Sequence, residues 1–225
     1  MPHDLAAEDA QIGVAVILDV RGSRRLSDRV AGQRQLEQVL ADVNRAVPAL
    51  QPLEPTVGDE CQGLYRSTEG ALEATLRVLL GVHEPVDCRF GIGAGRFHRI
   101  ETGSSSRIQD GSAWWSARDA IDTTKSKETK KPILRTWYAR GSDLSDAELR
   151  ESPSPDVVTA YLLARDFLVS RMSDRSRRLL LGLLDGRSQV ELAAAEGILQ
   201  GSVSLNLKNS GAQSLYDGMI ELRRD

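Results

Sequence analysis

The sequence predicts an α+β fold in which a domain of mixed strands and helices precedes an all-helical domain. Ile12–Val20 is a continuous apolar run, typical of a strand buried on both faces. From Ser27 to Val47 the apolar residues recur at helical spacing instead. Helical patterns fill the chain after residue 157. These three observations separate a mixed first part from a helical second part.

The first part reads as β-α-β-β-α-β. After the first strand and helix, a Gly58-Asp59 turn between two strand-like segments predicts a hairpin. A second amphipathic helix and a further strand follow, and this strand is expected to run into a glycine-rich turn at residues 91–95. This is the ferredoxin-like order. The later predicted elements are strands 53–57, 60–65, 86–92 and 133–138, helices 69–82 and 112–121, and a loop at 102–109.

We predict a mixed domain at residues 1–140, a linker at 141–156 and a helical domain at 157–225. The linker is placed by its acidic residues, serines and two prolines, Pro153 and Pro155. A chain of 225 residues can bury one large core or two modest ones.

Composition narrows the class of protein. The chain is 40% hydrophobic and 27% charged with a formal net charge of −3, which argues against wholesale wrapping of nucleic acid but allows a local basic surface. It contains no apolar run of the roughly 20 residues that cross a bilayer and no secretory signal pattern. We therefore expect a cytoplasmic protein without a membrane partner, in which Cys61 and Cys88 are reduced core residues.

Acidic residues stand at two places that the predicted topology brings together. The first and third strands of a β-α-β-β-α-β sheet are antiparallel central neighbours, so Asp19 is expected beside Asp59 and Glu60. Carboxylates this close repel one another, and a divalent cation is the usual remedy. We predict Mg2+ or Mn2+ held by these three residues, together with a phosphorylated ligand. Structural alternatives are a plain Gly-Asp hairpin turn and an aspartate that merely begins a turn.

Groups suited to phosphates lie nearby in the sequence. The turn at Gly22 and Ser23 would offer backbone N–H groups and a helix N-terminus to a polyphosphate. With Arg24, which follows them, they are the candidate nucleotide-binding residues. A basic cluster before the last strand could also contact phosphates or could form a solvated loop; it consists of Lys125, Lys127, Lys130 and Lys131.

The helical domain contains a predicted helix-turn-helix at residues 189–208. Gly197 stands where the turn requires a positive φ, and Val203 and Leu207 form the inward face of the second helix. Its exposed side chains could bond to base edges or phosphates of double-stranded DNA. The alternative is a helical hairpin used for dimerisation. The candidate DNA-binding residues are Ser202, Ser204, Asn206, Lys208 and Asn209.

Three blocks of the first domain resemble the SatD family, in their order and spacing, and the resemblance covers most of the chain, including its terminal helices. The block Val57-Gly58-Asp59-Glu60-Cys61-Gln62-Gly63 is the most specific. The other two are Val16-Ile17-Leu18-Asp19-Val20-Arg21-Gly22-Ser23-Arg24 and Arg89-Phe90-Gly91-Ile92-Gly93.

The same blocks are more distantly similar to class III nucleotidyl cyclases and diguanylate cyclases. That likeness implies a cyclase-like domain in which Asp19 and Asp59 hold magnesium ions, with Glu60 a third ligand, and in which Arg118 stabilises the transition state. The chain departs from the cyclase pattern at three positions: Trp114 replaces an asparagine, the position of the cyclases' base-selecting lysine falls near Pro55, and Val57 replaces a glycine.

These observations favour a transcriptional regulator that binds a nucleotide with magnesium through its first domain and DNA through its second. The alternative is a magnesium-dependent nucleotidyl cyclase, or a nucleotide-joining enzyme, with C-terminal dimerisation helices. A third hypothesis is a catalytically inactive scaffold. Cyclase-like sites and DNA half-sites both point to a homodimer.

Overall fold

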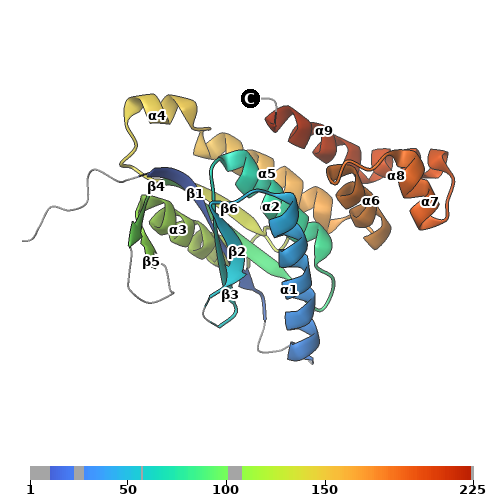
Figure 1. The fold of residues 1–225 in the computed structure, drawn as a ribbon, viewed down its shortest axis with the longest axis horizontal. Helices are drawn as coiled ribbons and strands as arrows, with labels where there is room; N and C mark the ends of the chain where they lie inside the picture. Colours follow the sequence, from blue (N-terminus) through green and yellow to red (C-terminus); the bar gives the residue numbers. More distant parts are fainter. Residues whose placement is uncertain (1–10, 23–27, 57, 101–107, 224–225) are drawn as a thin grey trace, which may run out of the picture.

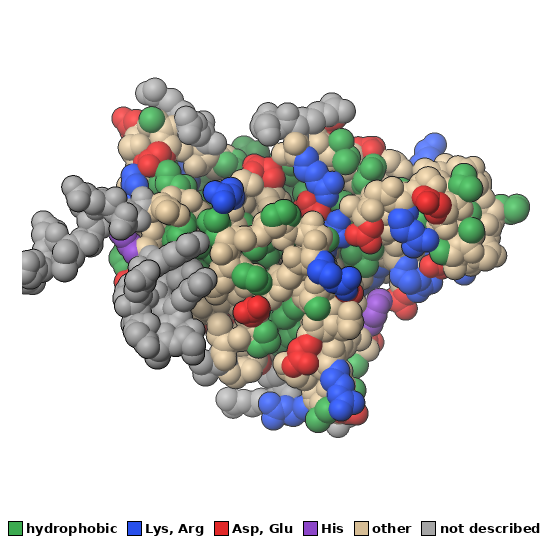
Figure 2. Space-filling view, viewed as in Figure 1, with side chains coloured by type: hydrophobic (Ala, Val, Ile, Leu, Met, Phe, Trp, Pro, Cys, Tyr) green, Lys and Arg blue, Asp and Glu red, His purple; other side chains and the backbone are tan. Residues whose placement is uncertain are grey.

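The structure is a computed structural model that describes residues 11–22, 28–56, 58–100 and 108–223. Strands and helices mix in its first part and helices alone form its last part, which confirms the α+β class (Figure 1). The C-terminal helices gather at one end of the molecule, next to the second helix of the mixed part. On the face seen in Figure 2, acidic and basic side chains are interspersed, in keeping with the formal net charge of −3.

The sheet is centred on β1 (Gln11–Val20). Its order is β2-β3-β1-β4-β5, and β6 pairs with β4. The β4–β6 pair is parallel, and the other pairs are antiparallel. The predicted pairing of the first strand with the third is therefore confirmed. The other strands are β2 (Gln51–Pro55), β3 (Glu60–Tyr65), β4 (Cys88–Ile100), β5 (Ile108–Asp110) and β6 (Thr136–Arg140).

One face of the sheet carries most of the core. Side chains of β1 alternate between faces, and Val16 and Leu18 are buried in a large hydrophobic cluster with residues of α1 (Arg29–Ala46) and α2 (Thr68–Gly81). Both helices begin at side-chain caps, since Asp28 accepts a hydrogen bond from the N–H of Ala31 and Ser67 from that of Gly70. The same cluster continues into the C-terminal helices.

The opposite face packs against α3 (Ser112–Lys127). The glycines at 91, 93 and 95 were expected in a turn, and that prediction is wrong, because all three lie within β4. They point to α3, where an added Cβ at Gly93 would lie 2.1 Å from the backbone nitrogen of Ala117. Glycine stands here because helix and strand backbones approach too closely for a side chain.

Three further segments differ from expectation. The predicted linker contains a short helix, α4 (Asp146–Glu151), whose first turn is closed by a capping box between Ser145 and Glu148. Part of the predicted loop at 102–109 is strand β5, while residues 101–107 lie outside the described residues. The last strand begins at Thr136 rather than residue 133 because a turn, closed by a hydrogen bond from the N–H of Leu134 to the carbonyl of Lys131, occupies the preceding residues.

The C-terminal helices are α5 (Pro155–Ser170), α6 (Asp174–Leu184), α7 (Gln189–Glu196), α8 (Gln200–Ser210) and α9 (Ala212–Leu222). A buried ion pair joins α5 to the sheet: Arg165 contacts Asp166 at 2.8 Å and donates to the hydroxyls of Thr75 and Thr136. Asp166 in turn accepts from the backbone N–H groups of Arg135 and Thr136, at 2.7 and 2.8 Å.

The division at residues 141–156 stays a prediction, because both sides of it contribute to one hydrophobic cluster. Within the described ranges, each helix is too short or too polar to cross a membrane.

Candidate functional site

The strand register brings distant charged residues to one place. Asp19 lies opposite Glu60 on β3 and opposite Arg89 on β4, and directly opposed residues in antiparallel strands share a face. That face is the one covered by α3, whose Arg118 and Lys125 reach the same side chains. We call Asp19, Glu60, Arg89, Arg118 and Lys125 the charged end of the sheet.

Asp19 is held by two cations. Its Oδ2 accepts a hydrogen bond from Nε of Arg89 at 2.6 Å, and Nζ of Lys125 lies 3.3 Å from its Oδ1. The Asp19 side chain is only 12% exposed, so water screens these contacts less than it screens surface ion pairs. Each carboxylate oxygen of Asp19 therefore already faces a positive charge.

Glu60 forms a two-pronged ion pair with Arg118. The guanidinium donates to both carboxylate oxygens at 2.6 and 2.7 Å, a geometry that fixes orientation as well as charge. The hydrogen bonds from Arg118, supported by one from Gln62, lower the pKa of Glu60 although its partial burial opposes them. The same pair raises the pKa of Arg118.

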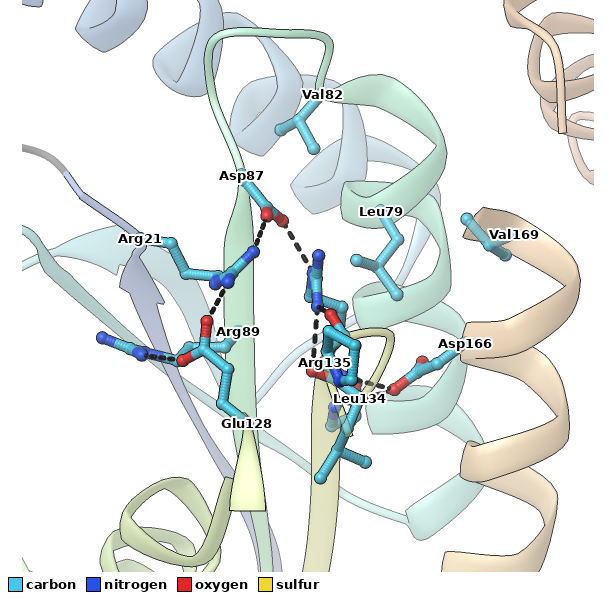
Figure 3. A network of polar contacts seen from close by, with 12 residues as sticks. Arg21, Leu79, Val82, Asp87, Arg89, Glu128, Leu134, Arg135, Asp166 and Val169 are labelled. Carbon is cyan, nitrogen blue, oxygen red and sulfur yellow. Dashed lines mark hydrogen bonds and ion pairs between the residues drawn. The ribbon is translucent and has the colours of Figure 1, made fainter. Parts of the chain in front are cut away.

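An alternating series of charges extends away from the charged end (Figure 3). Arg89 also contacts Glu128 at 2.6 Å, and Glu128 pairs with Arg21. Arg21 continues to Asp87, which pairs with Arg135 at 2.9 Å. This ion-pair chain links the start of β4 to the start of β6 and reaches the C-terminal helices, because Asp166 bonds to the backbone of Arg135.

Asp59 takes a different position from the other two predicted metal ligands. It precedes β3, and its carbonyl accepts the N–H of Val20 at 3.2 Å. It lines a cavity of about 50 Å³ that also touches Arg29 and Leu36 of α1. Within the described ranges, no group of three or more His, Cys, Asp or Glu residues is arranged to hold a metal ion. Metal binding by Asp19, Asp59 and Glu60 stays a prediction.

The predicted phosphate-binding turn is described only in part. Gly22 has a φ of 63°, which favours glycine, whereas Ser23 and Arg24 lie outside the described residues. The carboxylate of Asp28 already accepts one N–H of the first turn of α1, that of Ala31, at 2.9 Å. This helix N-terminus therefore has its own anionic cap.

Sequence reasoning missed Arg89 and Glu128 as members of the site. Arg89 opens the third recognised block, and extending the antiparallel register by one strand would have placed it opposite Asp19. For Lys125 the sequence left two interpretations open, a phosphate contact and a solvated loop. The structure places Lys125 in α3, where it contacts Asp19. No local signal marks Glu128, which reaches Arg89 only because α3 crosses β4 closely.

The helices predicted to bind DNA have the expected internal packing. Gly197 has a φ of 64°, and Val203 and Leu207 are fully buried. Ser202, Ser204, Lys208 and Asn209 are exposed, and Asn206 is half-buried.

The surface charge of these helices is less favourable for DNA binding. Arg178 forms a two-pronged ion pair with Glu196, and Arg175 lies 3.5 Å from the same carboxylate. Leu205, at 59% exposed, stands on the outer face of α8 between the polar positions. DNA binding by these residues stays a prediction without support from the geometry.

Comparisons with known proteins give one family match and several structural similarities. A sequence profile described as the SatD family matches residues 13–216, and no curated protein matches. A bacterial light-regulated adenylyl cyclase is 16% identical with a TM-score of 0.43, over 54% of this chain and 42% of the enzyme. The guanylate cyclase domain of RhGC from Catenaria anguillulae, in complex with GTP, is 15% identical with a TM-score of 0.40, over 50% of this chain and 73% of that one. With TM-scores this low, proposals for this chain rest on its own geometry.

Proposed function

The chain belongs to the SatD family, and we propose that its charged end binds a nucleotide through the phosphate groups, together with a divalent cation. The strand order β2-β3-β1-β4 supports a ferredoxin-like core, and such a core would present this end of β1 as the binding edge. The general proposal is nucleotide binding. The more specific proposal is that the chain cyclises or joins nucleoside triphosphates in a magnesium-dependent reaction.

One observation carries the proposal: Asp19 and Glu60 are partners across β1 and β3 and are matched by three cations, Arg89, Arg118 and Lys125. A cation that arrived with a polyphosphate would compete for the carboxylates. The released arginines and lysine could then pair with phosphate oxygens, for which a guanidinium fork is well suited. The site is thus arranged to exchange internal ion pairs for ligand contacts.

The donor set fits a magnesium ion that comes with its nucleotide. Magnesium is usually bound by one or two carboxylates plus substrate phosphates, rather than by a complete cage of protein ligands. Asp19 and Glu60 supply two carboxylates on one face of the sheet. When bound, such an ion would neutralise phosphate charge and polarise a phosphoryl oxygen.

The residues of the chain have separate parts in this proposal. Asp19 and Glu60 hold the cation, and Arg118 moves from Glu60 to a phosphate. Arg89 and Lys125 orient the other phosphates from β4 and α3. Asp59 fixes the hairpin through its carbonyl bond to Val20 and stays a candidate ligand.

Calorimetry with ATP, GTP and magnesium tests binding. Asp19→Asn removes a carboxylate charge from the site and is expected to weaken magnesium-dependent binding about 100-fold, as loss of one charge-assisted ligand does. Asp119→Asn is the matched control, since Asp119 is exposed on the same helix as Arg118 and its side chain makes no hydrogen bond or ion pair with a described residue. Equal binding by wild type and Asp19→Asn would refute the proposal.

Turnover is tested separately by product analysis. Each labelled nucleoside triphosphate is incubated with magnesium or manganese, and the products are separated. A cyclic or joined nucleotide that disappears in Arg118→Ala supports the enzyme. Binding without any product leaves nucleotide binding in place and rejects the enzymatic part.

A further inference from the structure

A second cavity lies at the other end of the ion-pair chain from Asp19, next to Asp87 and Arg135. It has a volume of about 240 Å³ and opens where the end of α2, the starts of β4 and β6, and helices α5 and α6 meet. Figure 3 shows Leu79 of α2, Val82 just after that helix and Val169 of α5 around Arg135. We call it the α2–α5 cavity. Its apolar lining is Leu79, Val82, Val86, Ile133 and Val169.

Arg177 brings a positive charge to this cavity and forms no ion pair with a carboxylate in the part of the chain that the structure describes. Its Nη1 donates to the carbonyls of Leu79 and Val82 at 3.2 Å, and its Nη2 donates to that of Val169 at 3.3 Å. Its buried Nε has no hydrogen-bond partner among the described residues. Carbonyl dipoles hold the guanidinium in place, but no carboxylate of the described residues neutralises its charge, and an anion in the cavity would do so through Nη1 or Nη2.

Most other charges that line the cavity are already matched. Arg135 pairs with Asp87 at 2.9 Å, and Asp166 receives Arg165 and two backbone N–H groups. Glu84 is exposed and makes no ion pair with any described residue. Among the described residues, the cavity lining therefore includes one cation, Arg177, and one anion, Glu84, without an ion-pair partner, next to apolar walls.

We propose that the α2–α5 cavity binds a small carboxylate with a branched apolar body, whose carboxylate pairs with Arg177. The volume equals that of about eight water molecules, which suits a short branched acid or an apolar α-amino acid. Apolar walls with a few polar groups are the usual lining of small-molecule sites. The two candidate sources share the carboxylate and differ in the ammonium group, which Glu84 would accept. This site does not depend on the nucleotide proposal.

Calorimetry on the full chain uses three matched probes: isovalerate, L-leucine and isoamylamine. Isovalerate and leucine carry the carboxylate and are expected to bind, while isoamylamine carries only the ammonium group and is expected not to bind. Tighter binding of leucine that is lost in Glu84→Gln identifies an amino-acid site. Tighter binding of isovalerate identifies a simple acid. Binding of isoamylamine as tight as that of isovalerate, or binding of no probe, overturns the proposal.

Variants locate the binding. Arg177→Met is expected to weaken binding of isovalerate at least about 10-fold, whereas Arg175→Met, the same charge loss at an exposed position of α6, should leave it unchanged. Because Arg177 also holds helix carbonyls, Ser170→Phe provides a second test: Ser170 is exposed at the cavity, and a phenyl ring there would fill it. Unaltered binding in either Arg177→Met or Ser170→Phe overturns the proposal.

Discussion

The two faces of the central sheet are built from the same strands but from different chemistry. On the α1–α2 face, Val16 and Leu18 of β1 join a cluster of large aliphatic side chains that extends to the C-terminal helices. On the α3 face, the neighbours Ala15, Ile17 and Asp19 meet a smaller cluster and then the charged end. One face therefore supplies most of the burial that stabilises the fold, and the other holds polar groups in place.

The glycines of β4 explain how the second face does this. Without side chains at 91 and 93, α3 lies directly on the strand. The next position on the same face is Arg89, where the strand carries a long side chain again. The last turns of α3 then bring Lys125 and Glu128 to Asp19 and Arg89. Close backbone packing thus sets the positions of the charges.

The largest loss of stability is expected from adding a side chain where β4 and α3 are in close contact. In Gly93→Ala the added Cβ would lie 2.1 Å from the nitrogen of Ala117 and 2.3 Å from the carbonyl oxygen of Ala113. Both atoms are backbone, so α3 must shift, and we expect a loss of about 3 kcal/mol or more in the free energy of unfolding. Urea unfolding measures it.

Gly218→Ala is the matched control, since nothing lies within 4 Å of a Cβ there. Alanine is the better helix former by about 1 kcal/mol, so this variant of α9 should be as stable as wild type or more so. If Gly93→Ala proved equally stable, the close approach of α3 would not explain the glycines of β4.

A second prediction compares adjacent residues on opposite faces. Leu18→Ala removes a fully buried side chain from the large cluster and should cost about 3 kcal/mol. Asp19→Asn keeps the volume of the side chain and leaves Arg89 paired with Glu128, so it should cost only about 1 kcal/mol. Denaturant unfolding of both variants measures the difference. A larger loss in Asp19→Asn would mean that the charged end, and not the aliphatic face, dominates stability.

Sequence patterns predicted the parts of this arrangement that depend on local periodicity and strand order. The apolar run of β1, the Gly-Asp turn and the β-α-β-β-α-β order were enough to place Asp19 beside Glu60. The glycines of residues 91–95 were mistaken for a turn because their role depends on a helix about twenty residues later in the chain. Arg165 and Asp166 gave no signal either, since a charged pair within a helix normally faces water, and only the packing of α5 on the sheet buries it.

The smallest effect concerns the ion pair between Glu60 and Arg118. The hydrogen bonds from Arg118 lower the pKa of Glu60 from its ordinary value of 4.5. A lowered folded-state pKa contributes stability above the unfolded-state pKa, and this contribution is lost as the pH falls through the folded-state value. Because Arg118 is 43% exposed, we expect the pair to be worth at most about 1 kcal/mol.

Glu60→Gln should therefore be less stable than wild type near neutral pH, and the gap should narrow as urea unfolding is repeated at successively lower pH, through the lowered folded-state pKa of Glu60. Glu37→Gln, at an exposed position of α1, is the control and should show a smaller gap at every pH. A gap for Glu60→Gln that stays constant across this range would show that the glutamate acts through its shape and not its charge. The internal ion pairs would then offer little resistance to an incoming cation, and the exchange of partners proposed for the charged end would lose its electrostatic basis.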